Sequence, residues 1–344
     1  WTASQGARLT PETPITLSWE NGQGLRFIRT VAVDRDYMFE VTDQVENSAT
    51  AAASLRPYGR VTRFETPPSE AAFVLHEGLI GVLGAQGLQQ ITYSDLKDDR
   101  EFKIAEPVEG GWLGITDKYW AAAIIPQDSY RPTFTFADQG RDSYQADYVG
   151  STVEVASGQA QEIRQRLFAG AKIVDVVDGY QERFNILNFD LLIDWGWFYF
   201  ITKPMFWLLD WLFRMVGNFG LAILIGTVLI KAALFPLANM SYRSMAKMKV
   251  LQPEMMAIRE RAGDDKVKMQ QEMMELYRKE KINPAAGCWP VLVQIPIFFA
   301  LYKVLYVTIE MRHAPFFGWI HDLAAPDPTT VFNLFGLLPY VPPQ

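Results

Sequence analysis

The stretch that decides the fold is residues 215–237, MVGNFGLAILIGTVLIKAALFPL, in which Lys231 is the only charged residue. As a helix, a stretch of this length is enough to cross the hydrocarbon core of a bilayer. A second stretch, residues 282–302, carries no charged side chain. A buried helix of a soluble protein seldom needs so long an uncharged run. We therefore predict two transmembrane helices, at residues 208–237 and 288–311.

The distribution of basic residues predicts the orientation of these helices. Ten Lys and Arg residues lie within residues 238–283, whereas residues 185–202 and everything after Arg312 contain none. Short loops rich in Lys and Arg stay in the cytoplasm. We therefore expect residues 238–283 in the cytoplasm and both flanks outside, which in a Gram-negative cell means the inner membrane with a periplasmic domain. The ten residues are Arg243, Lys247, Lys249, Arg259, Arg261, Lys266, Lys268, Arg278, Lys279 and Lys281.

The first half of the chain has a different pattern, typical of β-strands. Ile15, Leu17 and Trp19 alternate with polar residues, and Asn21-Gly22 leads into a second alternating run. A strand, an Asn-Gly turn and another strand are a strong hairpin signal. Helical periodicity is scarce except near residues 160–168. We predict an all-β sandwich over residues 1–180, built from short antiparallel strands.

Between the two halves, residues 185–207 are apolar and aromatic, with Asp190 and Asp194 spaced to share one helical face. Trp207 and Trp211 belong to a cluster of tryptophans just before the first span. This pattern predicts an amphipathic helix lying in the outer membrane interface. The alternative is a helix packed on the β domain.

The cytoplasmic segment, residues 238–283, predicts two helices that form an antiparallel hairpin with a turn at residues 263–265. Apolar residues recur there at heptad-like spacing, and methionine is frequent. Two interpretations remain: methionine offers clients an adaptable surface, and it also fills ordinary seams between helices. The two stripes are Met245, Met248, Gln252 and Met255, and Val267, Gln270, Met274 and Tyr277.

Composition and motifs argue against several classes of function. A net charge of −7, without a basic stripe in the β half, argues against a nucleic-acid-binding protein. One Cys and three His leave little room for a disulfide framework or a metal centre. The sequence has no phosphate-binding loop, serine-nucleophile elbow or zinc-protease motif. Asp95, Asp98 and Asp99 are interpreted as a solvated turn, His76 as structural, and Cys288 as a small buried residue. We therefore predict a protein that is not an enzyme and needs no cofactor or metal.

A purely structural role does not explain Lys231. A lysine at the centre of a membrane helix costs roughly 2.5–3.5 kcal/mol on insertion scales, so such residues usually face protein or water. Thr227 lies four residues earlier and therefore on the same helical face. Gln294 lies at a similar depth on the second span, so the three residues can line one polar recess open to the cytoplasm. The alternative is that Lys231 snorkels to the interface along its own stem, which is also the interpretation of Lys303.

Several motifs resemble the YidC/Oxa/Alb family of membrane protein insertases. Residues 227–237, TVLIKAALFPL, resemble its first conserved membrane helix, and residues 244–253, SMAKMKVLQP, the start of its cytoplasmic hairpin. Residues 283–298, NPAAGCWPVLVQIPIF, are similar to the entry into its next span, and APF at 314–316 with WIHDL at 319–323 to the loop beyond. These motifs run in the order that the family has.

The β half carries part of the same resemblance. Residues 110–114, GGWLG, with KYW at 118–120 and IP at 125–126, look like the large periplasmic domain of the Gram-negative members. That domain is a β-supersandwich similar to sugar mutarotases. The resemblance thus implies a multi-domain membrane protein with an all-β supersandwich and an α-helical membrane region. Residues 312–344 are then expected to form a periplasmic loop and the start of the next membrane segment.

The resemblance also implies a function. The family's groove carries a positive residue, usually Arg, at the position of Lys231, so Lys231, Thr227 and Gln294 are the expected substrate-binding groove. Met245, Met248, Met255 and Met274 are the expected contacts of the hairpin with the client or the ribosome. The implied partners are nascent membrane proteins, the ribosome, the Sec translocon and the lipid bilayer. An anchor is expected before Trp1 and three further membrane helices after Gln344.

Two other functions remain as alternatives. One is a membrane-anchored periplasmic carbohydrate-binding or mutarotase-like protein, which would need a His/Glu constellation in a β cleft, and the β half holds one His. The other is a channel or transporter, for which inverted repeats of spans would be the signature.

Overall fold

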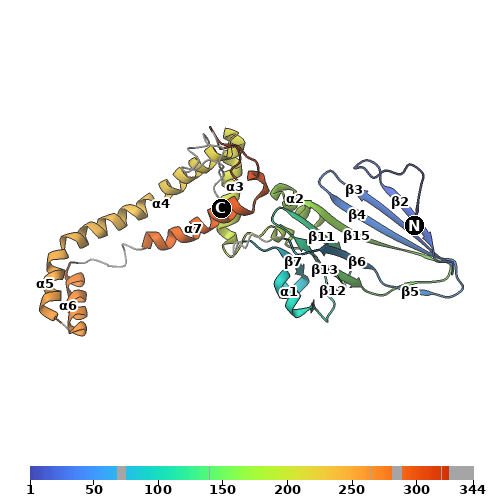
Figure 1. The fold of residues 1–344 in the computed structure, drawn as a ribbon, viewed down its shortest axis with the longest axis horizontal. Coiled ribbons are helices and arrows are strands. Elements are labelled where there is room, and N and C mark those ends of the chain that lie inside the picture. The colour runs from blue at the N-terminus through green and yellow to red at the C-terminus, as the bar shows by residue number, and fades with distance from the viewer. Residues whose placement is uncertain (68–74, 139, 264, 281–288, 319, 325–344) are drawn as a thin grey trace. The chain divides into compact units, whose positions relative to one another are not determined.

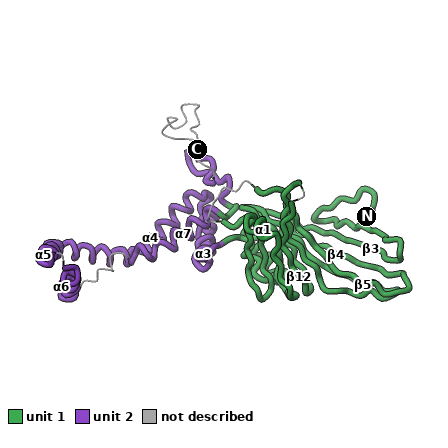
Figure 2. Tube along the Cα trace, turned by 60° about the horizontal axis from the view of Figure 1, so that its bottom comes forward, with its two compact units in different colours: residues 1–194, 307–310 green, residues 195–306, 311–344 purple. Residues whose placement is uncertain are grey.

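The structure is a computed structural model that describes residues 1–344 except 68–74, 139, 264, 281–288, 319 and 325–344. The chain forms two compact units, drawn in green and purple in Figure 2. The first unit comprises residues 1–194 and 307–310, and the second comprises residues 195–306 and 311–344. The predicted order of a β region followed by a helical region is therefore confirmed, and the two units divide after residue 194.

The first unit is a sandwich whose larger layer is an antiparallel sheet in the order β1-β2-β3-β4-β15-β11-β10-β7-β8 (Figure 1). The last strand in sequence, β15, therefore lies near the middle of this sheet, between β4 and β11. Its strands are β1 (Thr2–Ala3), β2 (Ile15–Glu20), β3 (Leu25–Val33), β4 (Met38–Asn47), β7 (Gly78–Leu83), β8 (Leu88–Thr92), β10 (Gly111–Thr116), β11 (Trp120–Pro126) and β15 (Ala160–Ala171).

A smaller sheet, in the order β6-β13-β12-β9, packs across part of the larger one. Between the two sheets lies an aromatic and aliphatic core that includes Leu113, Ile124, Phe134 and Tyr144. Burial of such side chains is the main favourable term in folding. The strands are β6 (Tyr58–Phe64), β9 (Glu101–Lys103), β12 (Tyr130–Asp138) and β13 (Asp142–Gly150), while β5 (Ala53–Leu55) and β14 (Val153–Val155) form a separate pair.

The predicted hairpin at the start of the domain is confirmed. β2 pairs antiparallel with β3, with Trp19 opposite Phe27. The Asn21 side-chain oxygen accepts hydrogen bonds from the backbone N–H of Gln23 at 2.8 Å and of Leu25 at 3.1 Å. Gly22 and Gly24 both have positive φ. The amide of Asn21 thus replaces backbone partners inside the turn, which is why this residue type predicts it.

The helical periodicity near residues 160–168 was misleading, because this stretch is part of strand β15. Its residues pair with β4 along one side, for example Leu167 with Phe39, and with β11 along the other, where Leu167 faces Ile124. Two rows of ladder hydrogen bonds outweigh a weak local preference, since strand propensity depends on neighbours.

The acidic cluster predicted as a turn is part of a short helix, α1 (Tyr93–Asp99). The Thr92 hydroxyl caps this helix by accepting a hydrogen bond from the Asp95 N–H at 3.1 Å. Lys97 pairs with Asp142 at 2.8 Å. The three aspartates therefore lie exposed on a capped surface helix, not in a turn. The other short elements of this unit are η1 (Gly84–Gln86), α2 (Val174–Phe184) and η2 (Phe189–Leu192).

The second unit is helical, and two of the helices among its described residues are long and apolar enough to cross a membrane: α4 (Phe219–Val250) and α7 (Trp289–Val307). Length and composition alone support this assignment, which agrees with the two uncharged runs of the sequence. The remaining elements are α3 (Tyr199–Val216), α5 (Gln252–Ala262), α6 (Lys266–Lys279) and the turn η4 (Ile309–Met311).

Two helix boundaries differ from the prediction. Residues 185–207 are not one helix, because Asn185 and Asn188 adopt left-handed backbone and Gly196 has φ +72°, and α3 then begins at Tyr199. The helix predicted at residues 208–237 is also not one helix, because α3 ends at Val216 and α4 begins at Phe219 and continues to Val250 with Pro236 inside it. Proline removes one backbone hydrogen bond but need not end a membrane helix. At 1.5 Å per residue, the 32 residues of α4 are roughly 48 Å long and extend beyond the bilayer core.

The predicted helical hairpin is present as α5 and α6, which lie side by side in Figures 1 and 2. Gly263 ends α5 with positive φ, and the Asp265 carboxylate caps α6 by accepting from the N–H groups of Val267 and Lys268. The seam holds Leu251, Met255, Ile258, Met273 and Leu276. Met255 therefore belongs to the predicted seam, whereas Met274 is exposed and its neighbour Met273 packs in the seam instead.

Candidate functional site

Helix α4 packs on α3 through small residues. A β-carbon built at Gly226 would lie 2.9 Å from Cδ2 of Leu209 and 3.5 Å from Cδ1 of Leu212. Near the start of the helix, Phe219 stacks on Phe213 with ring centroids 4.0 Å apart. Small residues allow the backbones of membrane helices to approach closely. One face of α4 is therefore committed to α3.

Lys231 lies on another face of the same helix. At about 100° per residue, Lys231 is turned roughly 140° from Gly226 and roughly 40° from Thr227. Its side chain is exposed, and it stands within the apolar part of α4. The Thr227 hydroxyl donates to the backbone carbonyl of Ile223 at 2.8 Å, so its oxygen can still accept a hydrogen bond. The structure thus places Thr227 and Lys231 on one side of α4, with Thr227 half-buried and Lys231 exposed and turned away from α3.

Gln294, the third predicted groove residue, is half-buried on α7. Within the described parts of the chain, no hydrogen bond joins it to Lys231 or Thr227. The segment that enters α7, residues 281–288, lies outside the described residues, and so does the candidate Cys288. The common recess of all three side chains therefore stays a prediction.

The interfacial segment contains a feature that sequence reasoning missed. Lys203 of α3 is buried, with its ammonium 5.7 Å from the ring centroids of Tyr199 and Trp207 and 6.0 Å from that of Trp195. Aromatic faces attract a cation by about 0.5–2 kcal/mol, more when water is excluded. Tyr199 and Trp207 are four residues before and after Lys203 in the sequence. This spacing could have predicted that the two rings lie beside the Lys203 ammonium on one face of the helix.

A neighbouring side of α3 presents an apolar stripe of exposed side chains: Phe200, Trp207, Trp211 and Met215. Aromatic rings of this kind favour the boundary between lipid and water. We therefore propose that α3 is the part of this segment that lies in the membrane interface.

Lys303 is not a snorkelling residue. It is 8% exposed, and its Cε lies 3.2 Å from the place of a β-carbon at Gly196. Lack of a side chain at Gly196 lets the stem of Lys303 pass close to the backbone. The interpretation from sequence failed because Gly196 and Lys303 are distant in the chain.

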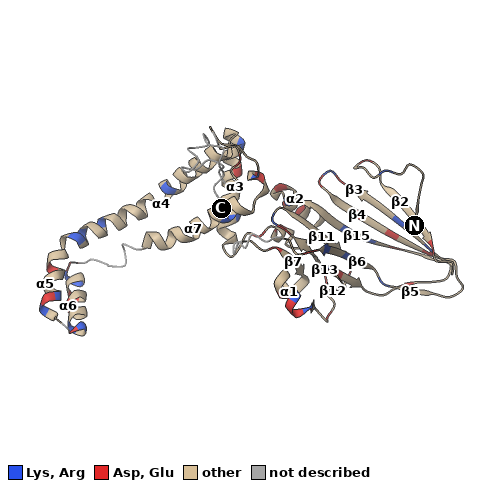
Figure 3. Ribbon diagram, in the orientation of Figure 1, with Lys and Arg blue, Asp and Glu red and all other residues tan. Residues whose placement is uncertain are grey.

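The methionines predicted for the hairpin divide into two kinds, and Met245 and Met248 lie near the end of α4 and not in α5 or α6. Met245 and Met274 are exposed, whereas Met248 is half-buried and Met255 packs in the seam between α5 and α6. The Tyr277 hydroxyl lies 4.0 Å from the sulfur of Met255. The segment therefore combines a packed seam with exposed methionines, and Lys and Arg residues recur along α5 and α6 (Figure 3).

No site for a metal or for acid–base catalysis stands out in the described residues. Among them, no group of three or more His, Cys, Asp and Glu side chains gathers closely enough to hold a metal ion. His76 is half-buried, and its Nε2 lies 3.0 Å from the Leu79 carbonyl oxygen, to which it donates. Burial lowers the pKa of His76, which favours the neutral ring.

A β-sandwich domain followed by an aromatic helix, two candidate spans and a basic hairpin defines a membrane protein with a large domain outside the bilayer. The chain matches the family described as YidC periplasmic domain over residues 1–208, and the family described as 60Kd inner membrane protein over residues 211–341. It belongs to the YidC family of inner-membrane proteins. The β domain is accordingly its periplasmic domain.

Curated relatives agree with this assignment. The chain is 58% identical to the membrane protein insertase YidC of Brucella suis, over all of this chain and 57% of that protein. It therefore spans little more than half the length of the curated relatives it matches. The match to a crystal structure of an active YidC insertase covers 94% of this chain and 62% of the chain in that structure, with 19% identity and a TM-score of 0.35. The match to the structure of a galactose mutarotase related enzyme from Lactobacillus acidophilus covers 49% of this chain and 70% of that chain, with 9% identity and a TM-score of 0.36.

Proposed function

We propose that the protein acts as a membrane protein insertase. Hydrophilic segments of client proteins would enter a positively charged groove open to the cytoplasm, and their apolar segments would pass from it into lipid. Membership of the family of insertases supports this activity. The observation that carries the groove is the placement of Lys231, exposed beside Thr227 on the face of α4 turned away from α3.

Electrostatics gives Lys231 its role in the proposal. Two unit charges 4 Å apart attract by about 1 kcal/mol in water and about 4 kcal/mol at an effective dielectric constant of 20. An ammonium held in a hydrated recess within the bilayer would therefore attract acidic client side chains more strongly than one in the cytoplasm. Thr227 and Gln294 would hydrate the recess and hydrogen-bond the client backbone.

Transfer of apolar surface would drive the step. Each Å² of apolar surface removed from water contributes about 25 cal/mol, so one client helix supplies the required free energy. The groove would shorten the distance over which polar client groups must cross lipid. No covalent chemistry is needed, in keeping with relatives that are named insertases.

The cytoplasmic hairpin would meet the ribosome or the arriving chain. Exposed methionines such as Met245 and Met274 give an adaptable apolar surface, and the basic residues around them favour contacts with polyanions. The Sec translocon is a further proposed partner. The protein would insert clients either together with the translocon or alone. A periplasmic carbohydrate-binding function is not favoured, because the matched family covers the membrane half as well.

The test is insertion of a client with an acidic translocated tail by the full-length protein carrying Lys231→Ala or Lys231→Arg. Loss of the charge is expected to lower insertion several-fold, and Arg is expected to preserve it. A client whose tail acids are changed to amides should be indifferent to the substitution. Lys249→Ala is the matched control, since Lys249 is also exposed on α4 but lies beyond the apolar window. Undiminished insertion by Lys231→Ala would exclude the charge role.

A further inference from the structure

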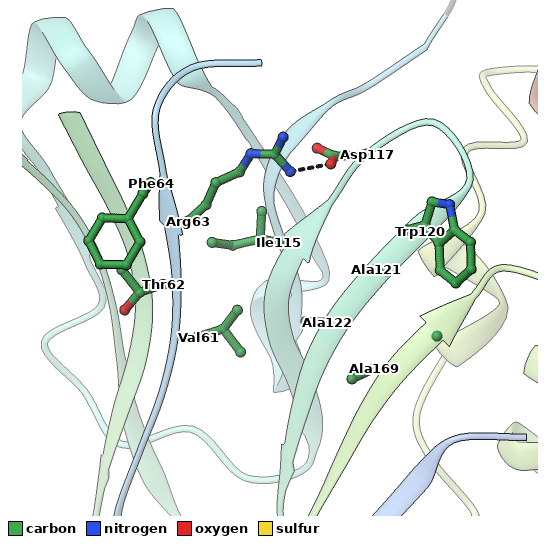
Figure 4. Close-up of a pocket in the computed structure, with 11 residues that line it drawn as sticks. Val61, Thr62, Arg63, Phe64, Ile115, Asp117, Trp120, Ala121, Ala122 and Ala169 are labelled. Atoms are coloured by element: carbon green, nitrogen blue, oxygen red, sulfur yellow. Dashed lines mark hydrogen bonds and ion pairs between the residues drawn. The ribbon is translucent and has the colours of Figure 1, made fainter. Parts of the chain in front are cut away.

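A cavity of about 470 Å³ opens at one end of the layer between the two sheets of the β domain (Figure 4). Ligand pockets commonly have volumes of about 300–1,000 Å³. β6 of the small sheet forms one wall, and β10, β11 and β15 of the large sheet form the other. Its lining residues are Val61, Thr62, Arg63, Phe64, Ile115, Asp117, Trp120, Ala121, Ala122, Ala169 and Gly170.

β6 is an edge strand, paired with β13 on one side only in the described structure. The hydrogen bonds at its two ends reveal which residues face β13. The Glu65 N–H donates to the Asp142 carbonyl at 2.9 Å, and the Gly150 N–H donates to the Pro57 carbonyl at 2.8 Å. Hydrogen-bonded pairs alternate along an antiparallel ladder, so the odd-numbered residues of β6 bond to β13.

The even-numbered residues of β6 consequently turn their backbone groups away from β13. These residues are Tyr58, Arg60, Thr62 and Phe64, and the last two of them line the cavity. In the described structure no other backbone or side chain bonds to the outward N–H and C=O groups of Thr62 and Phe64. Such a free edge is a template for another strand.

The opposite wall leaves room for side chains beside this edge. Ala122 of β11 and Ala169 of β15 pair directly, so their small side chains share one face of the large sheet. Ile124, two residues beyond Ala122 on the same face, belongs to the core between the sheets. Trp120, two residues before Ala122, is 55% exposed and forms the rim.

An ion pair bounds the cavity on another side. Arg63 pairs with Asp117 across the space between β6 and the loop after β10, and the Tyr93 hydroxyl donates to Asp117 Oδ1 at 3.2 Å. Figure 4 shows this pair at one side of the cavity and Trp120 at another. Because the two charges compensate each other, the cavity has no net charge from its lining and suits an uncharged ligand.

We infer that this cavity binds an extended polypeptide segment, which adds as an outer strand to the free edge of β6. The outward N–H and C=O groups recur every second residue, about 6.6–6.8 Å apart, and an extended backbone offers partners at the same interval. Alternate side chains of the segment lie over Ala122 and Ala169 and are apolar and of moderate size. The partner is an unfolded, uncharged stretch of polypeptide on the periplasmic side.

This site goes beyond the insertion step, since it lies in the β domain and uses none of the groove residues. A sugar would also stack on Trp120, but its hydroxyl groups do not reproduce the repeat of a strand. The test can separate the two, because only a peptide has alternating N–H groups. Its outcome is independent of Lys231, and the Lys231→Ala variant is expected to bind peptide normally.

The experiment measures fluorescence anisotropy of a dye-labelled octapeptide of alternating Val and Thr, kept soluble by a short ethylene glycol tail, with the full-length protein in detergent. Two further peptides carry N-methyl groups on all Val or on all Thr. Successive N–H groups of a strand point to opposite sides, so one methylated peptide is expected to lose binding at least tenfold and the other to retain it. Equal binding of both, or no binding of the parent peptide, overturns the inference.

Variants of the site complete the test. Thr62→Pro removes an N–H that takes no part in the ladder with β13, and it is expected to weaken binding at least tenfold. Thr62→Val keeps the N–H and is expected to bind normally. Ala169→Leu fills the space beside the edge and is expected to weaken binding without altering β6. Unchanged binding by both Thr62→Pro and Ala169→Leu overturns the inference.

Discussion

The ring of Phe316 lies against Gly220, in the space that a β-carbon at position 220 would need. Gly220 is in the first turn of α4, and Phe316 follows α7 in the loop that carries the APF motif. The two residues are almost a hundred positions apart in the chain. This contact explains why a glycine stands at the start of the first span, where helix propensity alone would favour other residues.

Gly220→Ala is expected to destabilise the helical unit, by about 1–3 kcal/mol, because the aromatic ring must move. The measurement is the unfolding midpoint of the purified protein in detergent. Gly179→Ala in α2 is the matched control, since no atom lies within 4 Å of a β-carbon there. That control is expected to stabilise by about 0.5–1 kcal/mol through helix propensity. Equal effects of the two substitutions would exclude the packing explanation.

The β domain is expected to lose stability in mild acid through His76. Burial lowers the pKa of His76 in the folded protein, so the unfolded chain binds more protons as the pH falls below its usual value of about 6.5. The stability contributed by the neutral ring is therefore present above that pH and is lost as the pH falls towards the lowered pKa. His76→Gln keeps a donor for the Leu79 carbonyl but cannot take up a proton.

Thermal unfolding of the wild type and His76→Gln at pH 7.5 and 5.0 measures this contribution. The advantage of the wild type over the variant is expected to shrink, or to reverse, at the lower pH. A difference between the two proteins that is the same at both pH values would mean that His76 stays neutral in the unfolded chain or charged in the folded one.

Asn47 holds together three backbone segments at the end of β4. Its side-chain amide donates to the carbonyls of Ala51 and Val155, both at 2.8 Å, and its oxygen accepts from the Ala49 N–H at 2.9 Å. Asn47→Ala is expected to cost about 2–4 kcal/mol, since these buried groups would lose their partners. Urea unfolding, followed by a spectroscopic signal from the β domain, measures this loss of stability.

A useful comparison is Asn47→Asp, which keeps the acceptor for Ala49 but removes both donors. It is expected to destabilise as much as Asn47→Ala or more, because a carboxylate would face two carbonyl oxygens. Wild-type stability of either variant would show that water replaces the amide.

Met273 and Met274 are adjacent but have different surroundings. Met273 packs in the seam of the hairpin against the core of Leu251, Ile258 and Leu276, whereas Met274 is exposed. Met273→Ser is expected to destabilise the hairpin by about 1–3 kcal/mol, and Met274→Ser by less than about 0.5 kcal/mol. Hydrogen exchange of α6 amides measures the difference.

Client crosslinking separates the roles of the same two residues. If Met274 belongs to a client surface, Met274→Ser lowers crosslinking of a nascent chain to the hairpin while exchange stays at the wild-type rate. Loss of crosslinking only in Met273→Ser would assign the whole effect to folding of the hairpin.

The sequence by itself determined the class of each half. Uncharged runs at residues 215–230 and 282–302 predicted the two spans, because a bilayer imposes its thickness on any helix that crosses it. Alternation around Asn21-Gly22 predicted the first hairpin. The shared face of Thr227 and Lys231 also followed from sequence, because their four-residue separation is fixed by the helix itself.

Tertiary structure decided which residues are buried, paired or left open. Residues 160–171 form strand β15 despite a weak helical pattern, because β4 and β11 pair with this strand on its two sides. Lys303 is buried because Gly196 lies beside it. The free edge of β6 exists because β13 covers only one of its sides in the described structure. Local periodicity reflects neighbours within a few residues, whereas these features depend on segments that meet only when the chain folds.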